Sequence, residues 1–243
     1  MNGEIAEIER LLDRCTPAQR RAIFDRLRQE FPIHAFEAKM NTQAEIILEA
    51  ISRAPDITQR GIRGIIAESV FVSDIVRPLT RDGWQDREIV GEQPYDVLLG
   101  DARGDVRIQM KMQRLTRGQP TTRRDYPGMY VVETQRTRSG TRTTDGVVQE
   151  QTRPYRFGDF DILAVSLHPS TGDWSDFRYT VAAWLLPRPN DPRLLRVFQP
   201  VALQPNDDWS DDVGEAITWF RAAQPKAIRT QGTPVAQQGT LGG

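Results

Sequence analysis

The stretch EQPYDVLLGDARGDVRIQMKMQ, residues 92–113, decides the fold that the sequence predicts. It has the pattern of two short strands, over residues 95–99 and 106–112, joined by a polar turn over residues 100–105. Side chains alternate between the two faces of a strand. The apolar face of the second strand carries Val106, Ile108, Met110 and Met112. Its polar face carries Arg107, Gln109, Lys111 and Gln113, so Gln109 and Lys111 are expected to point into one cleft.

Asp96 lies at the start of the first strand, so the predicted hairpin brings a carboxylate, an amide and an ammonium to one edge of a small sheet. Metal-assisted cleavage of a phosphodiester needs such a set. A carboxylate holds a divalent metal, since hard cations take oxygen ligands. The metal polarises the phosphate and lowers the pKa of a bound water, and an ammonium stabilises charge that develops on the phosphate oxygens.

Pro94-Tyr95-Asp96 followed by Gln109-Met110-Lys111 resembles the motif of the PD-(D/E)XK nuclease superfamily, whose fold is shared by many type II restriction endonucleases. Two departures stand out. Tyr95 is inserted between the proline and the aspartate, and Gln109 replaces the usual acidic residue, as in the QxK variant of some restriction and repair nucleases. The resemblance implies an α/β (or α+β) fold with a central mixed β-sheet flanked by helices.

The resemblance also implies roles for individual residues, with Mg²⁺ as the cofactor. Asp96 would be the central metal ligand and the backbone carbonyl of Met110 a second. Gln109 would position the metal or water, and Lys111 would assist the nucleophilic water. A superfamily helix before the hairpin often carries a further metal-binding glutamate, and Glu68 matches that placement.

Each of these residues has a simpler interpretation. The hairpin could be an ordinary amphipathic one with a solvated polar face, and Glu68 could pair with Arg63 or Arg77. Lysine usage favours the catalytic interpretation, because the chain has only three lysines and arginine supplies nearly all its positive charge. Lysine and arginine are not interchangeable where a compact point charge is needed.

The segment after the hairpin, about residues 113–156, is basic. Between residues 107 and 156 the sequence has 11 basic and 4 acidic side chains, a local charge of +7. We expect a long inserted loop that contacts DNA, because arginine reads base edges and binds phosphates. Its candidate contacts are Arg114, Arg117, Arg123, Arg124, Arg136, Arg138, Arg142 and Arg153. The alternative is a solvated or disordered loop.

Residues 1–55 are expected to form a helical region, and residues 56–223 the nuclease core. Thr16-Pro17 is an N-cap followed by a proline suited to the first helical position. Asn41 or Thr42 is expected to cap a later helix. Another helix is expected from Asp56 or Thr58 to Pro78. The helical region could dimerise, help to grip DNA or pack on the sheet.

Further elements follow from local patterns. Strands are expected at 88–91, 162–167 and 179–186, the second of them central and buried on both faces. A short helix is expected at 211–221, and a disordered tail at 224–243. Asp161 is expected to act as a cap or to pair with Arg153 or Arg156, rather than to support the site.

The net charge of −1 does not suggest a generic nucleic-acid binder, although it can hide a local patch. The single Cys15, the absence of a signal peptide and the absence of a membrane-spanning run predict a soluble cytoplasmic protein. The function expected is a Mg²⁺-dependent endonuclease of double-stranded DNA, most like a type II restriction enzyme. It would be a homodimer, with a possible cognate DNA methyltransferase acting on the same site.

Three other functions remain open. The first is a repair, junction-resolving or single-strand nuclease of the same superfamily. The second is a DNA-binding protein whose site has lost catalysis, with Gln109 as the sign of decay. The third is an interaction protein whose arginines contact acidic partners.

Overall fold

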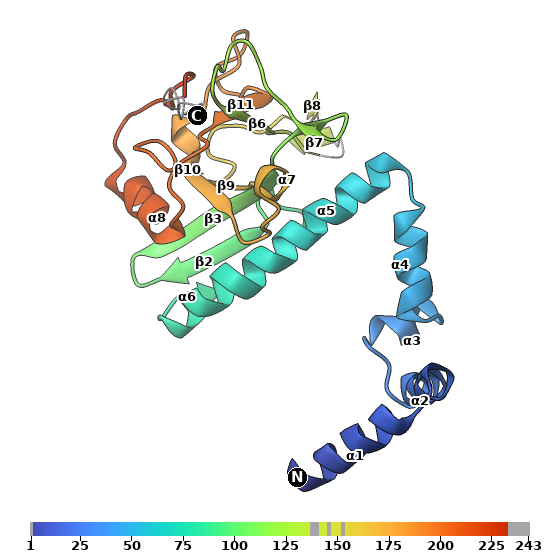
Figure 1. Ribbon diagram of the computed structural model, residues 1–243. Coiled ribbons are helices and arrows are strands. Elements are labelled where there is room, and N and C mark those ends of the chain that lie inside the picture. Colours follow the sequence, from blue (N-terminus) through green and yellow to red (C-terminus); the bar gives the residue numbers. More distant parts are fainter. Residues whose placement is uncertain (1, 137–140, 145–146, 152–153, 233–243) are drawn as a thin grey trace, which may run out of the picture. The chain divides into compact units, whose positions relative to one another are not determined.

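The computed structural model describes residues 2–136, 141–144, 147–151 and 154–232 (Figure 1). The chain forms two compact units, residues 1–62 and residues 63–243. Among the described residues, no helix is both long and apolar enough to cross a membrane.

The first unit is helical, with α1 at Asn2–Arg14, α2 at Pro17–Glu30, α3 at Phe36–Met40 and α4 at Ala44–Ser52. Thr16 caps α2 as its sequence predicts, because its side chain accepts from the Gln19 N–H while the Gln19 side chain accepts from the Thr16 N–H. The expected cap of α4 at Asn41 or Thr42 is wrong. Gln43 is the N-cap, and Asn41 instead ends α3 in the left-handed conformation.

Helix α5 spans Asp56–Phe71, and a π-helical segment at Val72–Val76 leads into α6 at Arg77–Arg81. The prediction that Pro78 ends this helix is wrong. Pro78 lies in the first turn of α6, and the helical path continues through it to Arg81. The wider π-helical turn before it relieves the clash that a proline makes with the preceding turn.

A five-stranded mixed sheet forms the centre of the second unit, in the order β1-β2-β3-β9-β10 (Figure 1). Its strands are β1 (Gln85–Asp86), β2 (Val97–Asp101), β3 (Gly104–Met112), β9 (Ile162–Ser166) and β10 (Phe177–Val181). Strands β3 and β9 run parallel, and the other neighbours are antiparallel. The mixed sheet with flanking helices is the predicted fold class.

Two strand boundaries differ from those predicted. The strand expected at 88–91 lies instead at Gln85–Asp86, where it pairs with β2. The strand expected at 179–186 begins earlier and ends at Val181, where a 3₁₀ turn over Ala182–Trp184 follows. Apolar residues continue past the end of the strand, so hydrophobicity alone could not locate it.

The hairpin of β2 and β3 pairs Val97 with Ile108 and Asp101 with Gly104. Its turn is shorter than the predicted 100–105, because both strands extend toward it. Gly104 has a φ of 115°, a conformation that side-chain-bearing residues rarely adopt, so glycine is required at this point of the turn.

The core lies on both sides of this sheet. All five residues of β9 are buried, as expected for a central strand. On one face Phe71 of α5 packs edge-on against Phe177, with ring centroids 5.4 Å apart, and also contacts Tyr179. The opposite face carries the polar side chains of β3. Of the two side chains predicted to point into a cleft, Gln109 is 2% exposed, and Gln113 on the same face is 1% exposed.

The basic segment, predicted as one long inserted loop, contains short strands. It contains β4 (Leu115–Thr116), β5 (Gln119–Pro120), β6 (Tyr130–Glu133), β7 (Thr141–Thr144) and β8 (Val147–Gln151). Strand β6 pairs with β11 (Phe198–Val201), from much later in the chain. Val131 and Val132 of β6 are fully buried. The polar composition of the segment gave no sign of this buried strand.

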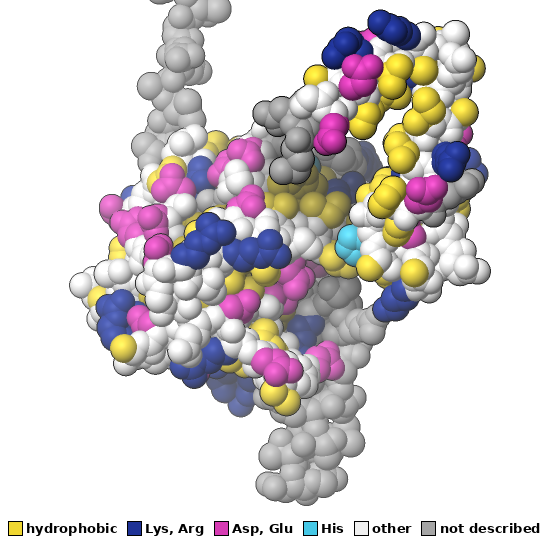
Figure 2. Space-filling view, turned by 90° about the horizontal axis from the view of Figure 1, so that it is seen from below, with side chains coloured by type: hydrophobic (Ala, Val, Ile, Leu, Met, Phe, Trp, Pro, Cys, Tyr) yellow, Lys and Arg dark blue, Asp and Glu magenta, His cyan; other side chains and the backbone are white. Residues whose placement is uncertain are grey.

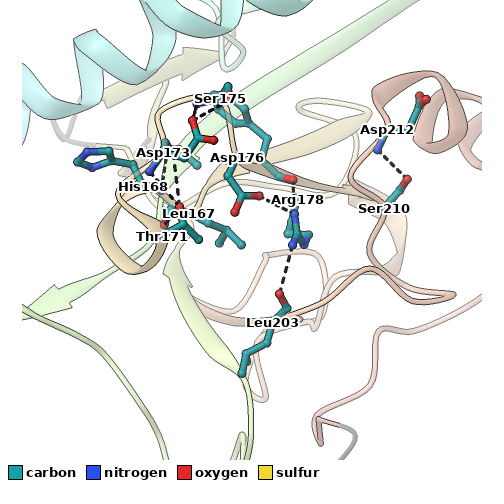
Figure 3. Close-up of polar contacts among 12 residues, drawn as sticks. Leu167, His168, Thr171, Asp173, Ser175, Asp176, Arg178, Leu203, Ser210 and Asp212 are labelled. Carbon is teal, nitrogen blue, oxygen red and sulfur yellow. Dashed lines mark hydrogen bonds and ion pairs between the residues drawn. The ribbon is translucent and has the colours of Figure 1, made fainter. Parts of the chain in front are cut away.

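The connection from β9 to β10 contains the short helix α7 (His168–Thr171) and several local polar contacts (Figure 3). The Asp173 carboxylate accepts from the N–H and hydroxyl of Ser175, at 2.8 and 2.7 Å. Arg178 donates to Asp176 at 2.7 Å and to the Leu203 carbonyl at 3.2 Å. The His168 ring stacks on Trp174, which gives it a structural role.

Helix α8 spans Val213–Ala222, capped by Asp212. Residues 224–232 do not match the predicted disordered tail. Ile228 is buried, its N–H donates to the Trp184 carbonyl, and Lys226 pairs with Asp208 at 2.8 Å. The buried Ile228 packs this segment against the hydrophobic core. Residues 233–243 lie outside the described part of the chain.

Candidate active site

The register of the hairpin places Asp96 opposite Gln109. The Asp96 N–H donates to the Ile108 carbonyl at 2.9 Å, which extends the ladder one residue beyond β2. One carboxylate oxygen of Asp96 then accepts from the backbone N–H of Met110 at 2.8 Å and from the side-chain amide of Gln109. These bonds hold the Asp96 carboxylate against the middle of β3.

Lys111 lies on the same face of β3 as Gln109. Its ammonium sits over the ring of Tyr155, 5.2 Å from the ring centroid. Burial lowers the pKa of Lys111, and the positive charge of Arg136 lowers this pKa further, while Asp96 and Glu68 oppose the shift. Lys111 therefore lies within the electrostatic field of both carboxylates.

Burial also raises the pKa of Asp96, against the opposing effects of Lys111 and the Met110 N–H. Glu68, on α5, is more than a third exposed, so its desolvation is partial. Its pKa is nevertheless raised by that desolvation and by the negative charge of Asp96, while Lys111 lowers it. Asp96 and Gln109 are thus in contact, and Glu68 and Lys111 lie within electrostatic range of Asp96.

The donors available to a cation here are all oxygen atoms. Among the described residues no group of three or more His, Cys, Asp and Glu side chains could hold a metal ion. A cation at this point would therefore need the Gln109 amide or the Met110 carbonyl beside Asp96 and Glu68. Such a set fits Mg²⁺, which takes one or two carboxylates and completes its shell with water and phosphate.

Gln109 is oriented in a way that bears on this fit. Its side-chain amide nitrogen donates both to Asp96 and to the Met110 carbonyl, the latter at 2.9 Å. To offer its oxygen to a cation, the amide must rotate by half a turn. An asparagine or glutamine amide can rotate in this way, because its two ends have nearly the same shape.

Lys111 has one aromatic and one basic neighbour that lie far from it in sequence, Tyr155 and Arg136. Tyr155 is buried at 3% exposure, and its pKa is raised by burial and by the charge of Asp96. Arg136 lies 5.9 Å from the centroid of the same ring. Arg136 was predicted only as a DNA contact, and Tyr155 was not predicted at all. No local pattern could have identified Tyr155, because 43 residues separate it from Lys111.

Gln113 extends the same face of β3 and is an unusual residue. It is 1% exposed, and neither its amide nitrogen nor its amide oxygen has a hydrogen-bond partner within the described ranges. An unsatisfied buried amide is rare in native proteins. The alternation of side chains placed Gln113 on this face, but nothing in the sequence indicated that it would be buried.

Several predicted DNA-contacting arginines already have partners. Arg114 forms an ion pair with Glu133, and Arg123 pairs with Asp125 at 2.9 Å. Both guanidinium groups also lie over the ring of Phe198, each 5.0 Å from its centroid. Their charges are partly neutralised by these carboxylates.

Arg117 and Arg124 differ from this pair. Arg117 is exposed in the turn between β4 and β5, with a φ of 52°, and Arg124 is exposed before Asp125. No ion pair of either arginine occurs within the described part of the chain. Arg142 lies in β7, but its side chain is not described. Arg138 and Arg153 lie outside the described residues.

Asp161 forms its described ion pair with Arg107, a partner that was not predicted, and Arg153 lies outside the described residues. Its carboxylate accepts from the Arg107 guanidinium at 2.7 and 3.0 Å and from the Arg107 backbone N–H at 2.8 Å. The parallel pairing of β3 with β9 brings these residues together. This charge-assisted cluster locks the register on which the positions of Gln109 and Lys111 depend.

No protein-family model and no curated protein sequence matches the chain. Among solved structures, the chain is similar to a bacterial homing endonuclease, I-Ssp6803I. The likeness has 21% sequence identity and a TM-score of 0.31, and it covers 50% of this chain and 68% of that chain. A TM-score this low assigns no function to the chain.

Proposed function

We propose that this protein is a Mg²⁺-dependent endonuclease that hydrolyses phosphodiester bonds of double-stranded DNA. The observation that supports the proposal is the contact of Asp96 with the Gln109 amide and the Met110 N–H, with Lys111 and Glu68 within electrostatic range of Asp96. Two acids and a lysine, partly removed from water, form a set that acid–base and phosphate chemistry requires.

Lys111 is the residue that acts on the phosphate. Its ammonium would stabilise negative charge that develops on the phosphate oxygens and orient the attacking water. Its lowered pKa makes it a better proton donor and acceptor near neutral pH than an ordinary lysine. The face of the Tyr155 ring helps to hold the ammonium in place.

Asp96 and Glu68, with the Gln109 amide oxygen or the Met110 carbonyl, would hold the metal. Mg²⁺ bound there would supply Lewis-acid polarisation of the phosphate and a lowered pKa for water. Its positive charge would also favour the ionised form of both carboxylates and so offset the rise in their pKa.

Cleavage of a supercoiled plasmid tests the proposal. The wild-type chain with Mg²⁺ should convert it to linear DNA, and Lys111→Ala should lose at least about a hundredfold in rate while still binding DNA. Lys111→Arg should also fail, because a guanidinium is not a compact point charge. Lys39→Ala, which removes a lysine from the helical unit, is the matched control and should cut normally. Unchanged cutting by Lys111→Ala would eliminate this site.

The finer proposal is a type II restriction endonuclease that recognises a short sequence as a homodimer. Intact duplex should then give discrete fragments, whereas a repair or junction-resolving enzyme would require a lesion or a branched substrate. A cognate methyltransferase is part of this proposal, and methylation of the recognition site should block cutting.

One observation favours a second candidate, a DNA-binding protein without catalysis. The Gln109 amide nitrogen donates a hydrogen bond to a carboxylate oxygen of Asp96. This hydrogen bond uses an oxygen that a metal ion would need. Binding in EDTA with no cleavage under Mg²⁺, Mn²⁺ or Co²⁺ would favour this candidate. Activity restored or raised in Gln109→Glu would identify Gln109 as a metal-site residue.

A further inference from the structure

Two arginines of the basic segment share one aromatic ring. The guanidinium groups of Arg114 and Arg123 each lie over Phe198 of β11, 5.0 Å from its ring centroid. A guanidinium held over an aromatic face loses freedom, while its N–H groups stay available at its rim. The side chains of Arg114 and Arg123 are 30% and 39% exposed. Both groups are therefore held in place at the surface, with edges that a ligand can reach.

A carboxylate fixes the orientation of each guanidinium. Asp125 accepts from Nε and Nη2 of Arg123, at 2.9 and 3.2 Å, and Glu133 accepts from Nη1 of Arg114. The other oxygen of Glu133 accepts from the Gln135 amide, which holds this carboxylate in turn. A guanidinium has five N–H donors. The remaining donors of Arg114 and Arg123 have no hydrogen-bond partner among the residues that the structure describes.

Phe198 is itself fixed to the fold. It lies opposite Glu133 in the ladder of β6 and β11. The Tyr126 hydroxyl donates to the Phe198 carbonyl at 2.9 Å and accepts from Arg196 at 3.1 Å. Tyr126 is 1% exposed. Donors supported by packed strands in this way bind a ligand with little loss of entropy, because their geometry exists beforehand.

The two carboxylates favour contact with a base over contact with a phosphate. An acidic side chain beside an arginine repels a phosphate and cancels much of the attraction on which phosphate binding depends. On the face drawn in Figure 2, basic and acidic side chains are likewise interspersed. A base edge is uncharged and requires donors at fixed positions instead. Among the four bases only guanine offers two acceptors in the major groove, O6 and N7, and one arginine can bind both.

We propose that Arg114 and Arg123 select the DNA sequence, each by binding O6 and N7 of a guanine, with double-stranded DNA as the ligand that the proposed function supplies. Asp125 and Glu133 are positioning residues, which hold the two guanidinium groups. A carboxylate in this position can also accept from the amino group of a cytosine. The eight arginines predicted as DNA contacts thereby divide by role, because these two read bases.

The base-reading pair lies near the candidate active site. Arg114 and Glu133 form an ion pair, and three residues from each of them along the chain, Lys111 and Arg136 lie over the ring of Tyr155. Three residues of extended chain span about 10 Å, which is the rise of about three base pairs. The guanine that Arg114 binds should therefore lie within about three base pairs of the bond that is cut.

Selection from a random-sequence duplex library tests the proposal, with the full-length chain in EDTA so that no DNA is cut. Wild type should enrich sequences that share fixed G·C pairs. Arg123→Gln should change the preference at one position from guanine to adenine, because an amide matches the donor and acceptor of adenine. Its affinity for the wild-type sequence should fall about tenfold, and its affinity for unrelated DNA much less. Arg114→Gln should do the same at a second position.

Two further variants separate base reading from charge. Arg117→Gln is the matched control, because Arg117 is an exposed arginine of the same segment. It should weaken binding to every sequence alike and leave the selected sequence unchanged. Asp125→Asn removes a negative charge and releases Arg123. This variant should bind unrelated DNA more tightly and yet discriminate less between the selected sequence and others.

A wild-type chain that enriches no sequence would overturn the proposal. So would Arg114→Gln and Arg123→Gln variants that keep the wild-type sequence and lose affinity equally for all DNA. The nuclease proposal fails separately. A protein that selects a guanine-containing sequence but never cuts would retain these contacts and remove the nuclease, whereas a protein that cuts every sequence alike would do the reverse.

Discussion

The Asp96 carboxylate is held by two hydrogen bonds and is partly removed from water, and these effects oppose each other. Because burial outweighs the favourable bonds, its folded-state pKa lies above its ordinary value. The folded chain then binds more protons than the unfolded chain between these two pKa values. The ionised carboxylate therefore lowers stability as the pH rises through that window, and the full penalty applies above it.

Asp96→Asn should consequently be more stable than wild type at pH 7 without metal, and the difference should vanish near pH 3, where both side chains are neutral. The same variant should cut DNA at least about a hundredfold more slowly. Thermal unfolding across pH, beside the plasmid assay, checks both outcomes. A variant less stable than wild type at pH 7 would contradict the assigned balance of burial and hydrogen bonding.

Gln113 supports a second prediction at this scale. Both polar atoms of its amide are buried without a partner in the described part of the chain. Leucine has a similar volume and no polar atom, so Gln113→Leu should stabilise the protein by about 1 kcal/mol. Chemical denaturation measures this. A loss of stability instead would mean that the amide holds an ordered water.

At the level of elements, Arg28 of α2 donates to Glu37 of α3 and to Glu45 of α4. This ion-pair cluster should make the helical unit sensitive to acid. The hydrogen bond from Arg28 lowers the pKa of Glu37 to about 2, from an ordinary 4.5. A carboxylate with a depressed pKa contributes stability that is complete above the unfolded pKa and is lost as the pH falls toward the folded one.

Helix content should therefore fall between about pH 4.5 and pH 2, when Glu37 takes up its proton. Glu37→Gln should lose helix content already at pH 7 and show a flatter acid transition. Far-UV circular dichroism measures both. Glu30→Gln is the matched control, because Glu30 is an exposed glutamate of the same unit, and its acid transition should match that of wild type.

The basic segment contains two kinds of arginine. Arg117 and Arg124 are exposed, whereas Arg114 and Arg123 are paired with carboxylates. If the segment binds phosphates, Arg117→Ala/Arg124→Ala should reduce the slope of log affinity against log salt by about 2. Arg114→Ala/Arg123→Ala, a matched double variant, should change it less. Equal effects of the two double variants would argue against direct phosphate contact by the exposed pair.

At the scale of the whole molecule, metal binding should couple to folding. A cation held by Asp96 and Glu68 binds the folded chain and not the unfolded one, so Mg²⁺ should raise the melting temperature of wild type. At a hundred times its dissociation constant the gain would be about 2.7 kcal/mol. Asp96→Asn should lose this gain, and Asp13→Asn, in the helical unit, should keep it. Equal shifts in all three proteins would place the ion elsewhere.

The amino-acid sequence determined those features that depend on neighbouring residues. The alternation of polar and apolar side chains placed Gln109 and Lys111 on one face of β3, and the unbroken apolar run of β9 marked it as a buried central strand. Thr16 and Pro17 located the start of α2. Each of these signals acts within a few residues, at the period of a single strand or turn.

Only the tertiary structure decided which distant residues meet. Lys111 lies over the ring of Tyr155, Arg107 binds Asp161, and β6 pairs with β11. Local patterns do not specify such contacts, because they depend on the register between strands and on how the packed elements exclude water. For the same reason the burial of Gln113 could not be predicted from its place on the polar face of β3, because exposure is a property of the surrounding chain and not of the residue.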